Sequence, residues 1–143
     1  MFKHILVAAD DSGPAKTAFI TARRLADQLG ATLTVVHVAD PVRETVPPTI
    51  PSSGLASDFS SGFGATLSTW CAELPGNVPV PEMIVKTGNP GHIIHDLTTS
   101  MRWDLVVMGT KSREGLRAFL GSVAEDVLKH SDVPVLVVRD KKV

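Results

Sequence analysis

The stretch DLVVMGTKSREGLRAFLGS, residues 104–122, decides the fold. It begins with the apolar run 105–108, which predicts a buried strand that breaks at Gly109. A basic loop with glycine follows, and a helical pattern starts after Gly121-Ser122. Glycine lets another group approach the backbone closely, and the first N–H groups of a helix lack helical partners and carry partial positive charge. The stretch therefore indicates either an anion site, with phosphate the most common occupant, or a surface loop with glycine turns.

Apolar runs and helical patterns alternate along the rest of the chain. The runs that predict buried strands cover residues 5–9, 32–38, 81–86, 105–108 and 134–138. The helical patterns between them cover residues 14–29, 67–74, 90–101 and 123–130. This alternation is typical of an α/β fold with a parallel sheet, helices on both faces and right-handed crossovers. A length of 143 residues suits one domain, residues 1–143.

Local signals mark where several helices begin and end. Asp11 or Ser12 is the expected N-cap of the first helix, because a short polar side chain can accept from the first free N–H groups. Gly30 is its expected C-cap. Asn89 is the expected N-cap of the third helix, with Pro90 at the first helical position.

Residues 40–64 are rich in Pro, Ser and Gly, and they predict a long loop. Two alternatives stay open for this segment: it lies over a site or an interface, or it is a disordered insertion. After it, Leu67, Trp70, Cys71 and Leu74 fall on one helical face, so Trp70 and Cys71 are predicted to lie in the core.

Charge and hydropathy argue against two classes of partner. A net charge of −1 provides no bulk attraction to nucleic acid or to an anionic membrane. No apolar run approaches the roughly 20 residues of a membrane helix, and the N-terminal sequence shows no signal-peptide pattern. A cytoplasmic location is therefore expected. The single cysteine, Cys71, excludes a disulfide within the chain.

The sequence shows no catalytic motif. It has neither a Gly-x-Ser-x-Gly elbow nor a Walker loop, and Ser12 follows two acids without an identifiable base. His92 and His95 are three positions apart, as in some metal sites, but no Cys or Glu lies at a matching spacing. They are interpreted as a solvated pair, and no catalytic residue or metal ligand is assigned.

The motifs taken together resemble the universal stress protein family over nearly the full length. The resemblance is carried by residues 10–12, 30–38, 88–90, 104–122 and 134–138. It implies a Rossmann-like fold with a five-stranded sheet in the order 3-2-1-4-5. It also implies a homodimer, paired through the last strand, residues 134–138, which would otherwise present an unpaired backbone edge.

Family members that bind ATP carry Gly-x-x-Gly, nine residues, and then Gly-Ser or Gly-Thr. Gly109 and the pair Gly121-Ser122 match this pattern, but Ser112 replaces the middle glycine and residues 113–120 are one residue short. If the position requires positive φ, Ser112 is strained by about 1 kcal/mol or more. If it does not, the hydroxyl can donate to a phosphate oxygen.

The resemblance assigns further roles by position, each with a structural alternative. Asp10 matches a strand-end aspartate near the ribose or a phosphate-bound metal, and Val38 matches a position whose backbone meets adenine. Asp10 can instead be a turn residue, Val38 a core residue, and Ser122 a helix cap. Lys111 and Arg113 are candidate phosphate contacts. The expected ligands are ATP and Mg²⁺, and the expected site residues are Asp10, Val38, Gly109, Lys111, Ser112, Arg113, Gly121 and Ser122.

Three functions stay open. The first is a cytoplasmic stress-response protein that dimerises and binds ATP as a regulatory switch, in which the ligand orders residues 109–121 and an unidentified protein partner binds that state. Any hydrolysis would be slow, because no general base is evident. The second is a nucleotide-independent dimeric interaction module. The third is an enzyme of the wider adenine-nucleotide α/β group, which would need a catalytic residue that the sequence does not show.

Overall fold

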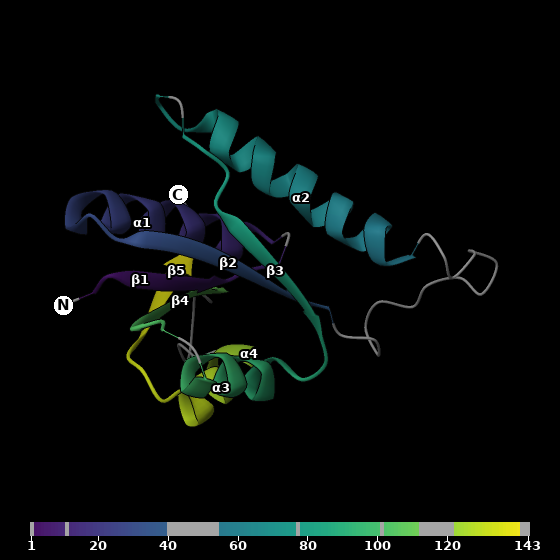
Figure 1. Cartoon of the computed structure of the whole chain (residues 1–143), viewed down its shortest axis with the longest axis vertical. Helices are drawn as coiled ribbons and strands as arrows, with labels where there is room; N and C mark the ends of the chain where they lie inside the picture. The colour runs from purple at the N-terminus through teal and green to yellow at the C-terminus, as the bar shows by residue number, and fades with distance from the viewer. Residues whose placement is uncertain are drawn as a thin grey trace.

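Five strands and four helices alternate along the described part of the chain. The structure, a computed structural model, describes residues 2–10, 12–39, 55–76, 78–100, 102–111 and 122–140. The elements are β1 (His4–Ala8), α1 (Gly13–Leu29), β2 (Thr32–Ala39), α2 (Leu55–Glu73), β3 (Glu82–Thr87), α3 (Pro90–Ser100), β4 (Leu105–Lys111), α4 (Ser122–His130) and β5 (Val135–Asp140). Helices α1 and α2 cover one face of the sheet, and α3 and α4 cover the other (Figure 1). None of the helices in these ranges is both long and apolar enough to cross a membrane.

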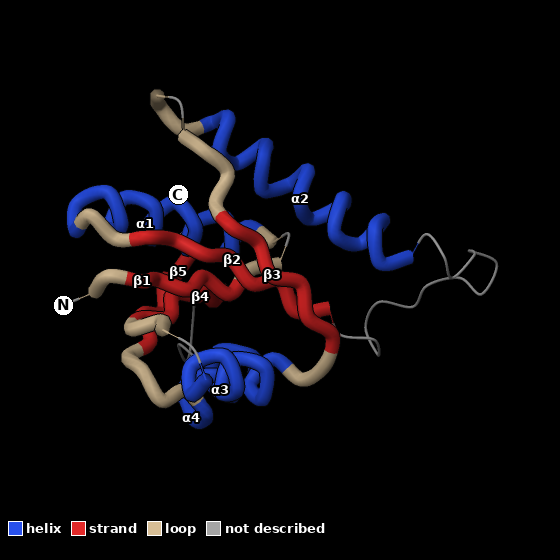
Figure 2. The backbone as a smooth tube through the Cα atoms, viewed as in Figure 1, coloured by secondary structure: helices blue, strands red, loops and turns tan. Residues whose placement is uncertain are grey.

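The strands form one parallel sheet in the order β3-β2-β1-β4-β5 (Figure 2). The predicted fold class and strand order are therefore confirmed. The central strand β1 pairs with β2 and β4 on its two sides, so that Ile5 lies opposite both Leu33 and Leu105. Ile5 is fully buried, as expected for a continuous apolar run in a strand covered on both faces.

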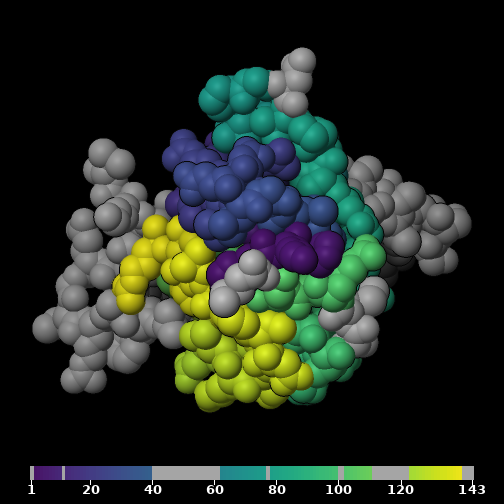
Figure 3. All heavy atoms as spheres, turned by 60° about the vertical axis from the view of Figure 1, so that its left-hand side comes forward, coloured from purple at the N-terminus to yellow at the C-terminus, as the bar shows by residue number. Residues whose placement is uncertain are grey.

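Two hydrophobic cores lie on opposite faces of the sheet. Val7 of β1 packs into the core beneath α1 and α2, together with Phe19. The neighbouring Leu6 points the other way and packs with Ile94 of α3 and Val127 of α4. The alternation of β1 side chains thus separates the two cores. In Figure 3 the atoms of β5 form part of the surface directly beside those of α1.

The predicted helix ends are confirmed where the structure describes them. The Ala15 N–H donates to Ser12 Oγ at 3.3 Å, so Ser12 caps α1, whereas Asp11 lies outside the described residues. Gly30 ends α1 in the left-handed conformation at φ 65°. The first turn of α3 is capped by Asn89, whose Oδ1 accepts from the His92 N–H at 3.1 Å.

The prediction of a loop over residues 40–64 is wrong for its last part, because α2 begins at Leu55. Residues 40–54 lie outside the described residues. The Ser and Gly residues of 55–64 have low helix propensity, but Phe63 of this segment and Leu67 after it are 4% and 0% exposed. Packing of an apolar stripe overrides weak propensity. The predicted core positions Trp70 and Cys71 are confirmed, at 5% and 3% exposure.

Candidate functional site

The carboxyl ends of β2 and β4 extend beyond the end of β1. The last partners of β1 are Val36 in β2 and Met108 in β4, both opposite Ala8. Beyond them, β2 continues to Ala39 beside β3, and β4 continues to Lys111 beside β5. The order in which strands are added to the sheet also reverses between β1 and β4, because β1 leads to β2 on one side and β4 leads to β5 on the other. Ligands of open parallel sheets bind at such a switch point, so this edge is the candidate site.

Asp10 follows β1 at this edge and shapes the turn into α1. Its Oδ1 accepts a hydrogen bond from the Ser12 N–H at 2.9 Å. Ser12 in turn caps α1, so the two residues set the start of that helix. The turn role that the sequence offered for Asp10 is therefore present without any ligand. The residue is exposed, so its carboxylate is also accessible to one.

Gly109 lies inside β4, so the prediction that the strand breaks there is wrong. Gly109 is paired in register with Val138, and the ladder to β5 continues to Lys111. An ideal Cβ on Gly109 would lie 2.1 Å from the carbonyl oxygen of Pro14 and 2.5 Å from its carbonyl carbon. The glycine is thus required by close packing of α1 on β4, and no ligand is needed to explain it.

The other predicted site residues divide into described and undescribed positions. Val38 is partly buried against the core beneath α3 and α4, in register with Lys86 of β3. The backbone of Lys111 ends β4. Helix α4 begins at Ser122, which is therefore its first residue, one position before the expected start. Ser112, Arg113 and Gly121 lie outside the described residues. The structure thus places Asp10, Val38, Gly109 and Lys111 near the carboxyl edge of three strands.

The sequence did not single out His37, which is buried close to this edge at 8% exposure. Its Nδ1 lies 3.0 Å from the Ala9 carbonyl oxygen, and because a carbonyl only accepts, we assign the proton to Nδ1. The ring stacks on Phe63 of α2 with centroids 4.4 Å apart and an interplanar angle of 9°. His37 therefore joins the ends of β1 and β2 to α2. The available signal was a histidine inside a buried apolar run.

The remaining histidines lie on β1, α3 and α4. Within the ranges that the structure describes, no group of three or more His, Cys, Asp or Glu residues could hold a metal ion. His92 and His95 are exposed, in keeping with the interpretation as a solvated pair. Their contacts with α4 were not expected, because they depend on the packing of two helices.

The model of the universal stress protein family matches residues 1–139. The chain belongs to the universal stress protein family. The Thermus aquaticus universal stress protein in QAH/OAS sulfhydrylase 3′ region is 32% identical over 140 residues, which cover 97% of this chain and 100% of that protein.

Solved structures of universal stress proteins share the fold. A family protein from Burkholderia pseudomallei superposes with a TM-score of 0.69 at 26% identity, covering 96% of each chain. A universal stress protein solved in complex with cAMP superposes with a TM-score of 0.67 at 19% identity, covering 96% of this chain and 97% of that one. At that identity, the second likeness shows the fold alone.

Proposed function

We propose that this universal stress protein is a dimer that binds an adenine nucleotide with Mg²⁺ at the carboxyl edge of the sheet, as a regulatory switch. The supporting observation is the extension of β2 and β4 beyond β1, which leaves the exposed Asp10 at the switch point of the sheet. The cAMP complex of a protein with this fold favours an adenine nucleotide as the ligand class. The family pattern matches Gly121 and Ser122, and we propose the Ser112 hydroxyl and the charges of Lys111 and Arg113 as further phosphate contacts.

Asp10 offers a clean test of the nucleotide site. Asp10→Asn keeps the oxygen that accepts from the Ser12 N–H, so the turn persists, but it removes the negative charge that a nucleotide-bound Mg²⁺ would meet. We expect titration calorimetry of Mg²⁺-ATP into nucleotide-stripped protein to give a dissociation constant about tenfold higher for this variant, which corresponds to about 1.4 kcal/mol.

Asp27→Asn is the matched control, because Asp27 lies near the other end of α1 and pairs with Arg23 at 3.0 Å. This variant should bind as the wild type does. Absence of saturable heat at millimolar ATP in the wild type would contradict the nucleotide proposal. Equal dissociation constants for Mg²⁺-ATP in the wild type and both variants would show that Asp10 does not contribute to nucleotide binding.

A second candidate function is a dimeric interaction module that does not use nucleotide. It is favoured by the fact that Asp10 and Gly109 both have structural roles without a ligand. Dimerisation unchanged by nucleotide stripping, together with a flat ATP titration, would favour this module. In neither case do we propose a catalytic residue, and any ATP hydrolysis should be slow.

The proposed dimer forms through β5, the edge strand that β4 flanks on one side. Leu136 of this strand is 39% exposed, and on α4 Val123 and Leu128 are 37% and 41% exposed. A strand edge with exposed apolar side chains is a template for pairing with another chain. A second copy related by a two-fold axis presents the same edge, so that the free backbone N–H and C=O groups of the two β5 strands can bond to each other.

A further inference from the structure

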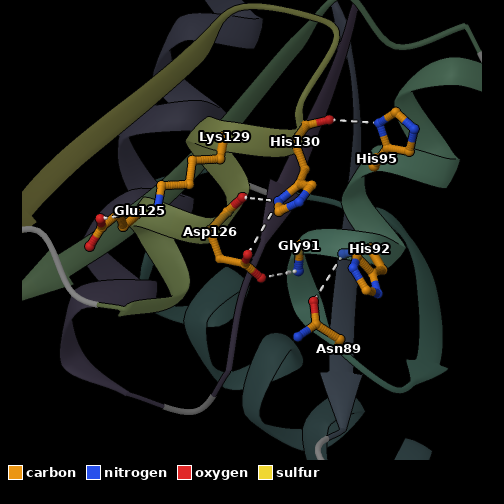
Figure 4. A network of polar contacts seen from close by, with 8 residues as sticks. All are labelled: Asn89, Gly91, His92, His95, Glu125, Asp126, Lys129 and His130. Atoms are coloured by element: carbon orange, nitrogen blue, oxygen red, sulfur yellow. Dashed lines mark hydrogen bonds and ion pairs between the residues drawn. The ribbon is translucent and has the colours of Figure 1, made fainter.

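A carboxylate of α4 occupies the first turn of α3. The Gly91 N–H donates to Asp126 Oδ2 at 3.1 Å (Figure 4). An ideal Cβ on Gly91 would lie only 2.1 Å from that same oxygen, so the carboxylate fills the space of the missing side chain. The first turn of a helix has free N–H groups and partial positive charge, which favour an anion. Asp126 therefore anchors α4 to the start of α3.

The other oxygen of this carboxylate faces His130, one helical turn along α4. His130 Nδ1 lies 3.2 Å from Asp126 Oδ1 and 2.8 Å from the Asp126 carbonyl oxygen. Both oxygens only accept, so we assign a proton to Nδ1, which donates to them. The carbonyl oxygen of His130 in turn accepts from His95 Nδ1 at 2.7 Å. His130 thus contacts both the anchoring carboxylate and α3.

The ring of His130 also meets the ring of His92 in the first turn of α3. The ring centroids are 5.5 Å apart and the planes are at 89°, an edge-to-face contact. His92 is exposed and the side chain of His130 is 38% exposed, so protons can reach both rings. Histidine is the ordinary side chain whose charge changes between pH 5 and 8.

We propose that His130 makes the contact between α3 and α4 proton-sensitive: protonation strengthens its pairing with Asp126 and turns its ring contact with His92 into repulsion. Two imidazolium rings at this separation repel. Acid therefore separates the His92 ring from His130, while Asp126 still holds Gly91.

The other titratable groups around the pair are exposed or have partners of their own. On α4, Glu125 and Lys129 form an exposed ion pair at 3.4 Å. On α3, Asp96 is exposed and has an interaction of its own. After α4, the exposed Asp132 donates its backbone N–H to Thr98 Oγ1 at 3.5 Å. On α3, His95 donates through Nδ1 to the His130 carbonyl oxygen, a bond that both the neutral and the charged ring can make.

A double-mutant cycle between positions 92 and 130 tests the proposal without any nucleotide. The variants are His92→Asn, His130→Asn and the double variant, unfolded in urea at pH 8.0 and at pH 5.5. We expect the coupling between the two positions to be near zero at pH 8.0. At pH 5.5 the coupling should be unfavourable. The unfolding equilibrium constant of the wild type should then be about threefold larger than the value expected if the effects of the two substitutions were independent. Coupling of the same size at both pH values would overturn the proposal.

His4→Asn supplies the matched control, since His4 lies at the start of β1 and bonds Thr32. A cycle between positions 4 and 92 should show no pH-dependent coupling. A spectroscopic readout covers the case in which the variants unfold. In the wild type, the nuclear Overhauser contact between the rings of His92 and His130 should weaken in acid while the Gly91 amide stays protected from exchange. Persistence of the ring contact at pH 5.5, or loss of Gly91 protection, would contradict the mechanism.

Discussion

The carbonyl oxygen of Pro14 lies where a side chain on Gly109 would begin, 2.1 Å from the ideal Cβ position. This contact is made by helix backbone, which cannot rotate away as the end of a side chain can. The first turn of α1 therefore approaches β4 more closely than any residue other than glycine permits. The same turn carries the cap Ser12 and follows Asp10, so the contact also positions the candidate site.

We expect Gly109→Ala to destabilise the fold by about 3 kcal/mol, because α1 must move off β4. Urea unfolding at neutral pH measures the change. Gly62→Ala in α2 is the control, since a Cβ there meets nothing within 4 Å. It should stabilise by about 0.5–1 kcal/mol, as alanine is the better helix former. Equal stability of Gly109→Ala and the wild type would show that α1 adjusts freely.

The C-cap of α1 gives a prediction about backbone conformation. Gly30 has φ 65°, and a Cβ at this position would meet nothing within 4 Å. Any cost of Gly30→Ala therefore arises from the left-handed conformation, and we expect about 1 kcal/mol. Gly30→Asn should cost less, because asparagine tolerates this region better. The midpoints of urea unfolding rank the three proteins. A midpoint for Gly30→Asn no higher than that for Gly30→Ala would contradict this explanation.

The buried thiol of Cys71 makes stability depend on alkaline pH. Burial raises the pKa of this thiol above its ordinary value, and the charge of Arg23 opposes the shift in part. The folded chain thus keeps the proton to higher pH than the unfolded chain, so unfolding releases a proton once the pH exceeds the ordinary thiol value. The stabilisation is complete below that value and is lost as the pH rises through the raised one.

We therefore expect the free energy of unfolding to fall more steeply from about pH 8.5 upward in the wild type than in Cys71→Ala. Urea unfolding with a reductant across this range gives both slopes. The comparison concerns the slopes alone, since Cys71→Ala also removes packing at every pH. Parallel profiles would mean that the thiol has the same proton affinity in both states.

The proposed dimer predicts a specific effect at the β5 edge. Leu136→Asp places a charge on the strand that would pair with its copy, and it should weaken dimerisation at least tenfold, or about 1.4 kcal/mol. Val80→Asp is the control, because Val80 is 51% exposed and lies just before β3, at the opposite edge of the sheet. Sedimentation velocity at micromolar concentration separates monomer from dimer. A monomeric wild type would exclude the β5 dimer.

Features set by nearby residues could be predicted from the sequence. The buried strands follow from apolar runs, and the caps at Ser12, Gly30 and Asn89 follow from side chains that act within one turn. The start of α2 could not be predicted in this way, because local composition favours a loop and the helix depends on tertiary packing of residues such as Phe63.

The packing role of Gly109 could not be predicted from the sequence. The sequence offered Gly109 as a ligand contact, whereas the contact that the structure shows is with the backbone of Pro14, which approaches it from another element. The contact of Asp126 with Gly91 joins residues 35 positions apart and leaves no periodic signal. Such contacts follow from the angle and distance at which two elements pack, which neither composition nor spacing encodes.

The central position of β1 has a consequence for synthesis on the ribosome. When β2 has emerged, one edge of β1 can be paired, but its other edge waits for β4, whose entry is marked by a hydrogen bond from the His4 N–H to Asp104, 100 positions later. Throughout that interval the nascent chain carries an unpaired strand edge beside the apolar side chains of residues 5–8, which is the kind of surface that pairs wrongly with other chains. The order of the sheet therefore leaves β1 paired on one side only while the ribosome translates residues 40–104.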